Sequence, residues 1–89
     1  MRNIDILKEA MAKLEMSDFE MELTTGYKLG TIKETEEQLD RDLTDDMMIS
    51  ISKRYREIFN SIGYHFISGN AYKGQAMFLT RTNNSRTSR

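Results

Sequence analysis

Residues 44–63 constrain the fold of this 89-residue chain more than any other segment. Their apolar side chains recur at spacings of three and four, the period of one face of an α-helix. The members of this face are Met48, Ile51, Tyr55, Ile58, Phe59 and Ile62. Thr44 is a suitable N-cap, and Gly63 suits the left-handed position that ends many helices. Because such a helix must cover its apolar face, the rest of the chain has to supply a second layer.

A second helix is predicted near the N-terminus. Ile4, Leu7, Met11 and Leu14 have the same three-and-four spacing, and Asn3 is placed to cap the first turn.

From Phe19 onward the apolar residues recur at every second position. Phe19, Met21 and Leu23 alternate with polar residues, which is typical of a half-buried strand. A three-residue loop ending at Gly26 would return the chain as a second strand, with Tyr27 opposite Leu23. Residues 18–29 therefore predict a first β-hairpin.

Two further segments complete the expected fold. Residues 33–43 are strongly polar and predict a short surface helix or an ordered loop, in which only Leu39 and Leu43 reach a core. Residues 64–68 and 75–82 predict a second hairpin around a loop with glycine at both ends.

We expect an α+β fold, a small two-layer sandwich of about four antiparallel strands on two helices. Residues 1–82 form the single domain, and residues 83–89 are expected to be a basic, disordered tail.

Composition excludes several chemistries. The chain has no Cys, so it has no disulfide, no thiolate zinc site and no thiol nucleophile. No apolar run is long enough to span a bilayer, and the N-terminus lacks the apolar core of a signal peptide. A cytoplasmic location is the natural expectation.

No motif for catalysis or cofactor binding is complete. Asp40 and Asp42 resemble the start of a calcium loop, but Asp45 and Ile51 stand where glycine and glutamate are needed. Residues 69–74 have the glycine spacing of a phosphate-binding loop without the Lys and hydroxyl that follow it. His65 is the only His and has no evident nucleophile to activate. We expect no enzyme activity, no metal and no cofactor.

The charges are divided unequally along the chain. Residues 1–46 hold 13 acidic and 6 basic residues, whereas residues 47–89 hold 1 acidic and 7 basic residues, so the total of −1 conceals two opposite halves. Charge asymmetry of this kind indicates binding surfaces.

The acidic half suggests a small protein-interaction module. Its carboxylates would attract a partner with a basic groove, such as one that handles nucleic acid, so an inhibitor or regulator of the phage-encoded kind is the favoured hypothesis. The predicted contact residues are Glu34, Glu36, Glu37, Asp40, Asp42, Asp45 and Asp46.

The basic half suggests an alternative, a winged-helix-like nucleic-acid-binding protein. The long helix would enter the groove and residues 72–73 would form the wing tip. The predicted phosphate contacts are Lys53, Arg54, Arg56, Lys73 and Arg81, with Arg86 and Arg89 in the tail. The sequence pI of about 5.8 argues against this alternative.

Self-association is a third possibility. Met47, together with Met48 and Phe59 at the edges of the apolar face, would extend that face beyond what one sheet covers, which would suit a homodimer.

Overall fold

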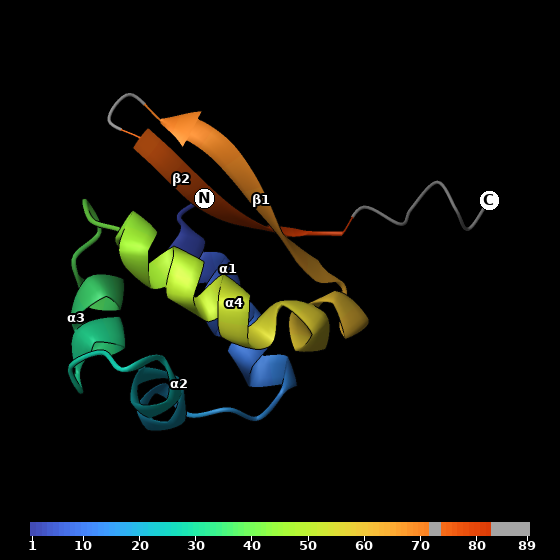
Figure 1. Cartoon of the computed structure of the whole chain (residues 1–89). Coiled ribbons are helices and arrows are strands. Elements are labelled where there is room, and N and C mark those ends of the chain that lie inside the picture. Colours follow the sequence, from blue (N-terminus) through green and yellow to red (C-terminus); the bar gives the residue numbers. More distant parts are fainter. Residues whose placement is uncertain (72–73, 83–89) are drawn as a thin grey trace.

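The computed structural model describes residues 1–71 and 74–82, and it consists of four helices followed by one antiparallel hairpin (Figure 1). The elements are α1 (Asn3–Lys13), α2 (Asp18–Thr25), α3 (Thr31–Glu37), α4 (Asp45–Ser61), β1 (Tyr64–Ala71) and β2 (Gly74–Arg81). The α+β class is therefore confirmed, but the predicted sandwich of four strands on two helices is wrong.

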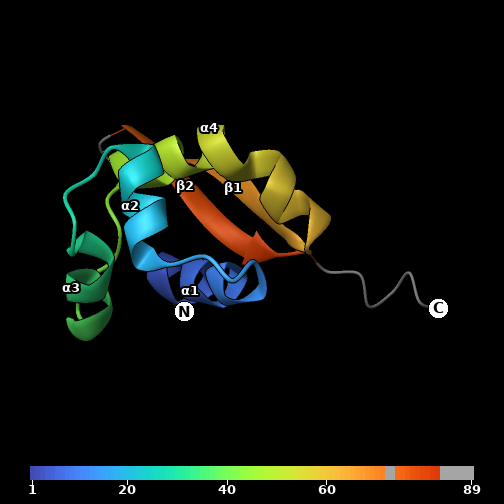
Figure 2. The same ribbon diagram turned by 90° about the horizontal axis from the view of Figure 1, so that it is seen from below.

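The hairpin packs against α4 with both strands and against α1 through β2. Figure 2 shows the hairpin lying between α1 and α4, while α2 and α3 stand together at one end of the molecule. In the hairpin, Phe66 pairs with Leu79 and both are buried, whereas Ile67 pairs with Phe78 on the opposite, exposed face.

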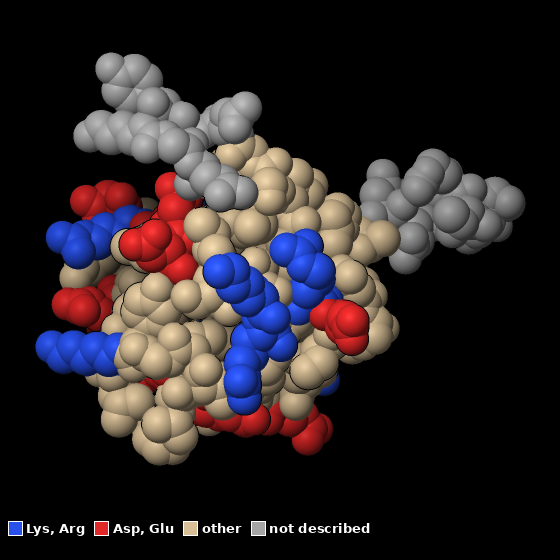
Figure 3. Space-filling view, viewed as in Figure 1, with Lys and Arg blue, Asp and Glu red and all other residues tan. Residues whose placement is uncertain are grey.

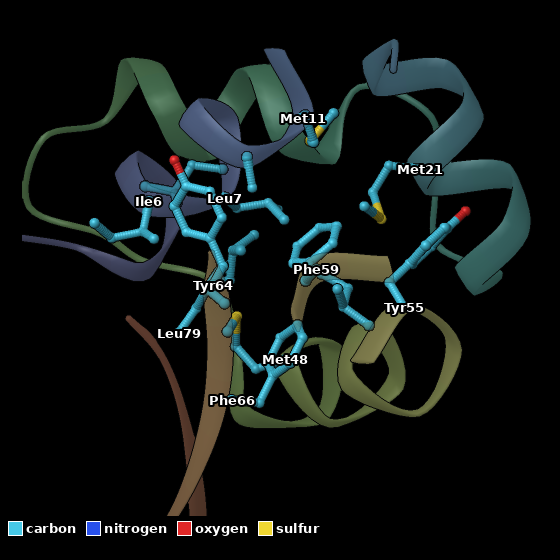
Figure 4. Packing of buried hydrophobic residues seen from close by; sticks show 14 of the residues in the cluster. Ile6, Leu7, Met11, Met21, Met48, Tyr55, Phe59, Tyr64, Phe66 and Leu79 are labelled. Atoms are coloured by element: carbon cyan, nitrogen blue, oxygen red, sulfur yellow. The ribbon is translucent and has the colours of Figure 1, made fainter. Parts of the chain in front are cut away.

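The core is rich in methionine and aromatic side chains (Figure 4). The Phe59 ring lies 5.5 Å from the Phe66 ring and 5.9 Å from the Tyr55 ring, so α4 joins the hairpin through stacked aromatics. Met11, Met21 and Met48 fill the spaces around them, as flexible thioether side chains can.

The predictions for the long helix and for the second hairpin are confirmed, but the predicted loop 69–74 is too long, because Gly69 and Ala71 pair with Ala76 and Gly74 inside the strands. The Thr44 hydroxyl accepts a hydrogen bond from the Met47 N–H at 3.1 Å, and Gly63 has a left-handed φ of +96° just after the helix. Ile58 is the one member of the predicted face that is exposed, at 44%. The N-terminal helix is also confirmed, although Arg2 and not Asn3 is its N-cap.

The first hairpin is wrong, because residues 18–25 form α2. Only Met21 of the three alternating apolar residues is buried, while Phe19 and Leu23 are exposed. Ser17 caps this helix by accepting from the Glu20 N–H at 3.1 Å. Met, Glu and Leu are good helix formers, and the segment has no β-branched residue before Thr24, so helix propensity prevails over the two-residue period. Gly26 is left-handed as predicted, but it ends a helix.

The short surface helix predicted within residues 33–43 exists as α3. Leu43 is buried as expected, but Leu39 is 81% exposed and the core contact of α3 is Ile32. Met47, Met48 and Phe59 are each at most 1% exposed, so the suggested dimer surface through them is wrong. The predicted tail, residues 83–89, lies outside the described residues.

Candidate protein-binding surface

A buried carboxylate fixes the position of α3 against α2. Glu22 is 2% exposed, and its two oxygens accept hydrogen bonds from the Gly30 N–H at 3.0 Å and the Ile32 N–H at 2.8 Å. These amides belong to the first turn of α3, which has no intrahelical partner for them. The Glu22 side chain of α2 therefore caps α3, and we call the two helices the α2–α3 unit.

The other end of α3 is held by Arg2. Its guanidinium donates to the carbonyl oxygens of Thr35, Gln38 and Arg41 at 2.9–3.0 Å and to that of Glu36 at 3.2 Å. The last carbonyl groups of a helix have no hydrogen-bond partner within the helix, and Arg2 supplies one here. Its positive charge also interacts favourably with the negative, C-terminal end of the helix dipole.

Asp5 completes this arrangement by binding the same guanidinium. The hydrogen bond and charge of Arg2 lower the pKa of the Asp5 carboxyl. Arg2 and Asp5 thus attach the end of α3 and the loop after it to the start of α1.

Most of the predicted acidic residues are exposed around α3. We call this set the acidic surface, and it comprises Glu34, Glu36, Glu37, Asp40, Asp45 and Asp46. Figure 3 shows acidic side chains over α3 and the start of α4, with a few basic ones among them. Lys8 binds Asp18 at 2.7 Å and approaches Glu36 at 3.8 Å, so α1 partly neutralises one edge of the surface. The remaining carboxylates have no ion-pair partner within the described residues.

Asp42 does not belong to the acidic surface, although the sequence placed it there. Its carboxylate accepts from the Asn3 N–H at 2.8 Å and from the Ile4 N–H at 2.9 Å, and so caps the first turn of α1. This side chain has a structural role that sequence spacing did not reveal.

Removing the Asp42 cap should therefore destabilise the protein. We expect Asp42→Ala to lower the free energy of unfolding by about 1–2 kcal/mol, as the loss of a helix cap does. Asp40→Ala, a matched exposed carboxylate two residues away, should change it by less than about 0.5 kcal/mol. Urea denaturation measures both, and equal effects of the two substitutions would contradict the capping role.

The predicted basic residues fall in different places. Lys53, Arg54 and Arg56 are exposed together on α4, around a shallow hollow that Glu57 and Ile58 also line. Figure 3 shows basic side chains gathered over the middle of α4. Lys73 lies outside the described residues. Arg81 is engaged elsewhere, because it binds both carboxylate oxygens of Glu9 at 2.6 and 2.7 Å.

Glu9 forms the centre of a small network between α1 and the hairpin. It accepts from Arg81 and from the Tyr64 hydroxyl. The Arg81 guanidinium, followed by the Tyr64 hydroxyl, lowers the pKa of Glu9 to about 2. Burial and the bond to Glu9 raise the pKa of Tyr64.

This network predicts a loss of stability in acid. Because the folded pKa of Glu9 is below its usual value of 4.5, the stabilisation is complete above pH 4.5 and disappears as the pH falls toward about 2. Glu9→Gln should therefore reduce the slope of stability against pH in that window, measured by thermal unfolding. Glu37→Gln, on the exposed side of α3, serves as the control, and equal slopes for wild type and Glu9→Gln would refute the prediction.

Beside the acidic surface lies a partly enclosed cavity of about 220 Å³. Its lining combines the largely apolar side chains of Tyr27 and Met47 with the opposite charges of Glu34 and Arg41. Among the residues that the structure describes, no group of three His, Asp or Glu side chains is suited to hold a metal ion. None of the helices in the described part of the chain is long and apolar enough to cross a membrane.

Sequence reasoning missed Arg2 and Glu22, the two residues that hold α3. A partial signal existed for Glu22, because it lies one residue from buried Met21 and would turn inward once the segment is taken as a helix. No local signal marks the role of Arg2 at α3, because the carbonyl groups that it binds lie 33 to 39 residues away. Comparisons with protein-family models, with curated proteins and with solved structures found no match.

Proposed function

We propose that this protein is a small, non-enzymatic, cytoplasmic module that binds a partner protein through the acidic surface. One observation carries the proposal: three of the exposed carboxylates, Glu34, Glu36 and Glu37, are mounted on a helix that is fastened at both ends, by Glu22 at its start and Arg2 at its end. A charged surface on a fixed element loses little freedom on binding, which favours affinity and specificity.

The chemistry of the surface defines the partner. Carboxylates attract a basic groove, and grooves that normally hold nucleic acid are basic. A protein that occupies such a groove competes with nucleic acid, so the expected role is inhibition or regulation of a nucleic-acid-handling enzyme.

The proposal is tested by affinity capture from cells that carry the gene. The immobilised protein is compared with a variant in which Glu34, Glu36, Glu37 and Asp40 are changed to Gln or Asn. The control replaces Lys53, Arg54 and Arg56 by Gln and leaves the acidic surface intact. A basic protein retained by the wild type and by the control, but lost by the acidic variant, is the expected result. Retention of the same protein by the acidic variant would contradict the proposal.

A second candidate function is DNA binding, and the order of α2 and α3 favours it. Two short helices are joined by five residues, 26–30, which follows the helix, turn, helix order of a DNA-binding motif, and in that motif the second helix enters the major groove. The charge opposes it, because residues 18–37 hold six acidic and two basic residues and would repel phosphate.

The two candidates differ in one direct measurement. Fluorescence anisotropy with a mixed-sequence duplex of about 20–30 base pairs should show no binding at about 0.1 M salt if the acidic surface dominates. Binding that weakens steeply with salt, and that replacing Lys28 and Lys33 of the α2–α3 unit by Gln abolishes, would favour the DNA-binding candidate.

A further inference from the structure

The described part of the chain treats the two outer edges of the hairpin differently. On the β2 edge, the Asn3 side chain donates to the Met77 carbonyl oxygen at 3.3 Å and accepts from the Leu79 N–H at 3.0 Å. One side-chain amide thus satisfies two backbone groups that a further strand would bind. Helix α1, which carries Asn3, also packs against β2, so this edge is protected.

Within the described residues the β1 edge has no such protection. Phe66 pairs with Leu79 and Ser68 pairs with Met77. Because Asn3 binds the outward groups of Leu79 and Met77, both pairs are of the kind in which the N–H and C=O groups point away from the other strand. Phe66 and Ser68 therefore direct these groups outward, and no hydrogen bond from residues 1–71 or 74–82 reaches them.

Strand β1 lacks the features that usually keep an edge strand from pairing. Such strands are short, bulged or covered, or they carry Pro or charged side chains. β1 has eight residues in an unbroken register with β2, and residues 64–71 include no Pro, Lys, Arg, Asp or Glu. Figure 1 shows no helix on the outer side of β1. Its outward backbone groups are therefore available to another strand.

A second copy of β1 can meet this edge in few ways. Under a two-fold axis the strands run antiparallel and each contact occurs twice. Outward groups must meet outward groups, so Phe66 or Ser68 has to face an even-numbered residue of the other copy. Two such registers use nearly the whole strand. One places Ser68 opposite the partner's Ser68, and the other pairs Phe66 with the partner's Ser68 and places Ile67 opposite the partner's Ile67.

The exposed side chains point to a second copy and to the register centred on Ile67. Ile67 is 46% exposed and pairs with Phe78, which is 51% exposed on the same face. Pairing at Ile67 extends these two into a row of four apolar side chains across four strands, and cross-strand apolar pairs stabilise a sheet. A charged residue at the axis would face its own copy, whereas Ile67 faces an identical apolar side chain.

We propose that a second copy of the chain adds its β1 to this edge, so that two hairpins form one four-stranded antiparallel sheet. Phe66 exchanges backbone hydrogen bonds with the partner's Ser68, and Ser68 does so with the partner's Phe66. The two Ile67 side chains meet at the two-fold axis. The inference rests on the hairpin and is independent of the proposed function.

The first test places charge at the two-fold axis. In sedimentation velocity over about 1–300 µM protein, the wild type should show a concentration-dependent monomer–dimer equilibrium. Ile67→Lys and Ile67→Glu should each weaken dimerisation about tenfold or more, because like charges then face each other. An equimolar mixture of the two variants should dimerise about tenfold more tightly than either alone, since opposite charges then meet. Leu39→Lys, at an exposed leucine outside the hairpin, is the control and should have no effect.

Hydrogen exchange tests the backbone pairing. The Phe66 and Ser68 amides should exchange slowly at high protein concentration and faster after dilution or in Ile67→Lys. The Ile67 amide, which points toward β2, should stay protected in both conditions. Circular dichroism verifies that every variant is folded.

Three results would overturn the proposal. The first is a wild type that stays monomeric throughout the concentration range. The second is a dimer that neither Ile67 variant weakens. The third is a mixture of the two variants that dimerises no better than either alone.

Discussion

Replacing Glu22 by alanine should lower the free energy of unfolding by about 2–4 kcal/mol. The substitution removes the acceptor for two amides at the start of α3, at Gly30 and Ile32. Gly30 is exposed and its amide can turn to water, but the Ile32 amide is left without a partner in a buried place. For a domain of this size the loss corresponds to a fall in melting temperature of roughly 10–20 °C. It is a large fraction of the stability that such domains possess, about 5–15 kcal/mol.

Urea denaturation of Glu22→Ala beside Glu20→Ala measures this effect. Glu20 lies on the same helix and is exposed, so its replacement should change stability by less than about 0.5 kcal/mol. Hydrogen exchange should also accelerate at the Ile32 amide in the Glu22 variant. Equal stability of the two variants would show that the buried carboxylate does not hold α3.

Replacing Arg2 by methionine should cost about 2–3 kcal/mol, because hydrogen bonds to a charged group are among the strongest in proteins. Methionine keeps much of the aliphatic volume but donates nothing to the carbonyl oxygens of Thr35, Gln38 and Arg41. Arg2→Lys should recover only part of the loss, since one ammonium group cannot reach carbonyls spread over this segment as the planar guanidinium does.

Residues 35–41 should lose their order before the rest of the protein does in the Arg2 variant. Hydrogen exchange at the Gln38 and Arg41 amides reports it. Lys33→Met, which removes an exposed cation from α3 itself, controls for the change in net charge. Unaltered exchange at these amides in Arg2→Met would contradict the role of Arg2 as the anchor of the acidic surface.

The sequence predicts an element correctly where the spacing of its apolar residues and the residues at its two ends indicate the same structure. In α4 the apolar spacing, the Thr44 cap and Gly63 all indicate one helix, and the structure has it. In residues 18–25 the spacing favoured a strand and the composition favoured a helix. The alternation was misleading because Phe19 and Leu23, which set it, are exposed and contribute nothing to the core.

The sequence predicted which residues of the candidate site carry charge, but it did not predict the contacts that hold them in place. The acidic run marks an exposed surface, as the side chains of Glu34, Glu36 and Glu37 show. Asp42 carries the same charge yet caps α1, because its loop returns to the N-terminus of that helix. Such long-range pairings depend on the tertiary fold, and no spacing within the segment encodes them.

The binding constant of the captured partner tests the central claim most directly. Isothermal titration of that partner into the wild type, at about 0.1 M salt, should give an affinity at least ten times higher than titration into the variant with Glu34, Glu36, Glu37 and Asp40 neutralised. The affinity for the wild type should fall as salt rises, and the variant should show a weaker salt dependence. Equal affinities for the two proteins, within about twofold, would contradict a role for the acidic surface in binding.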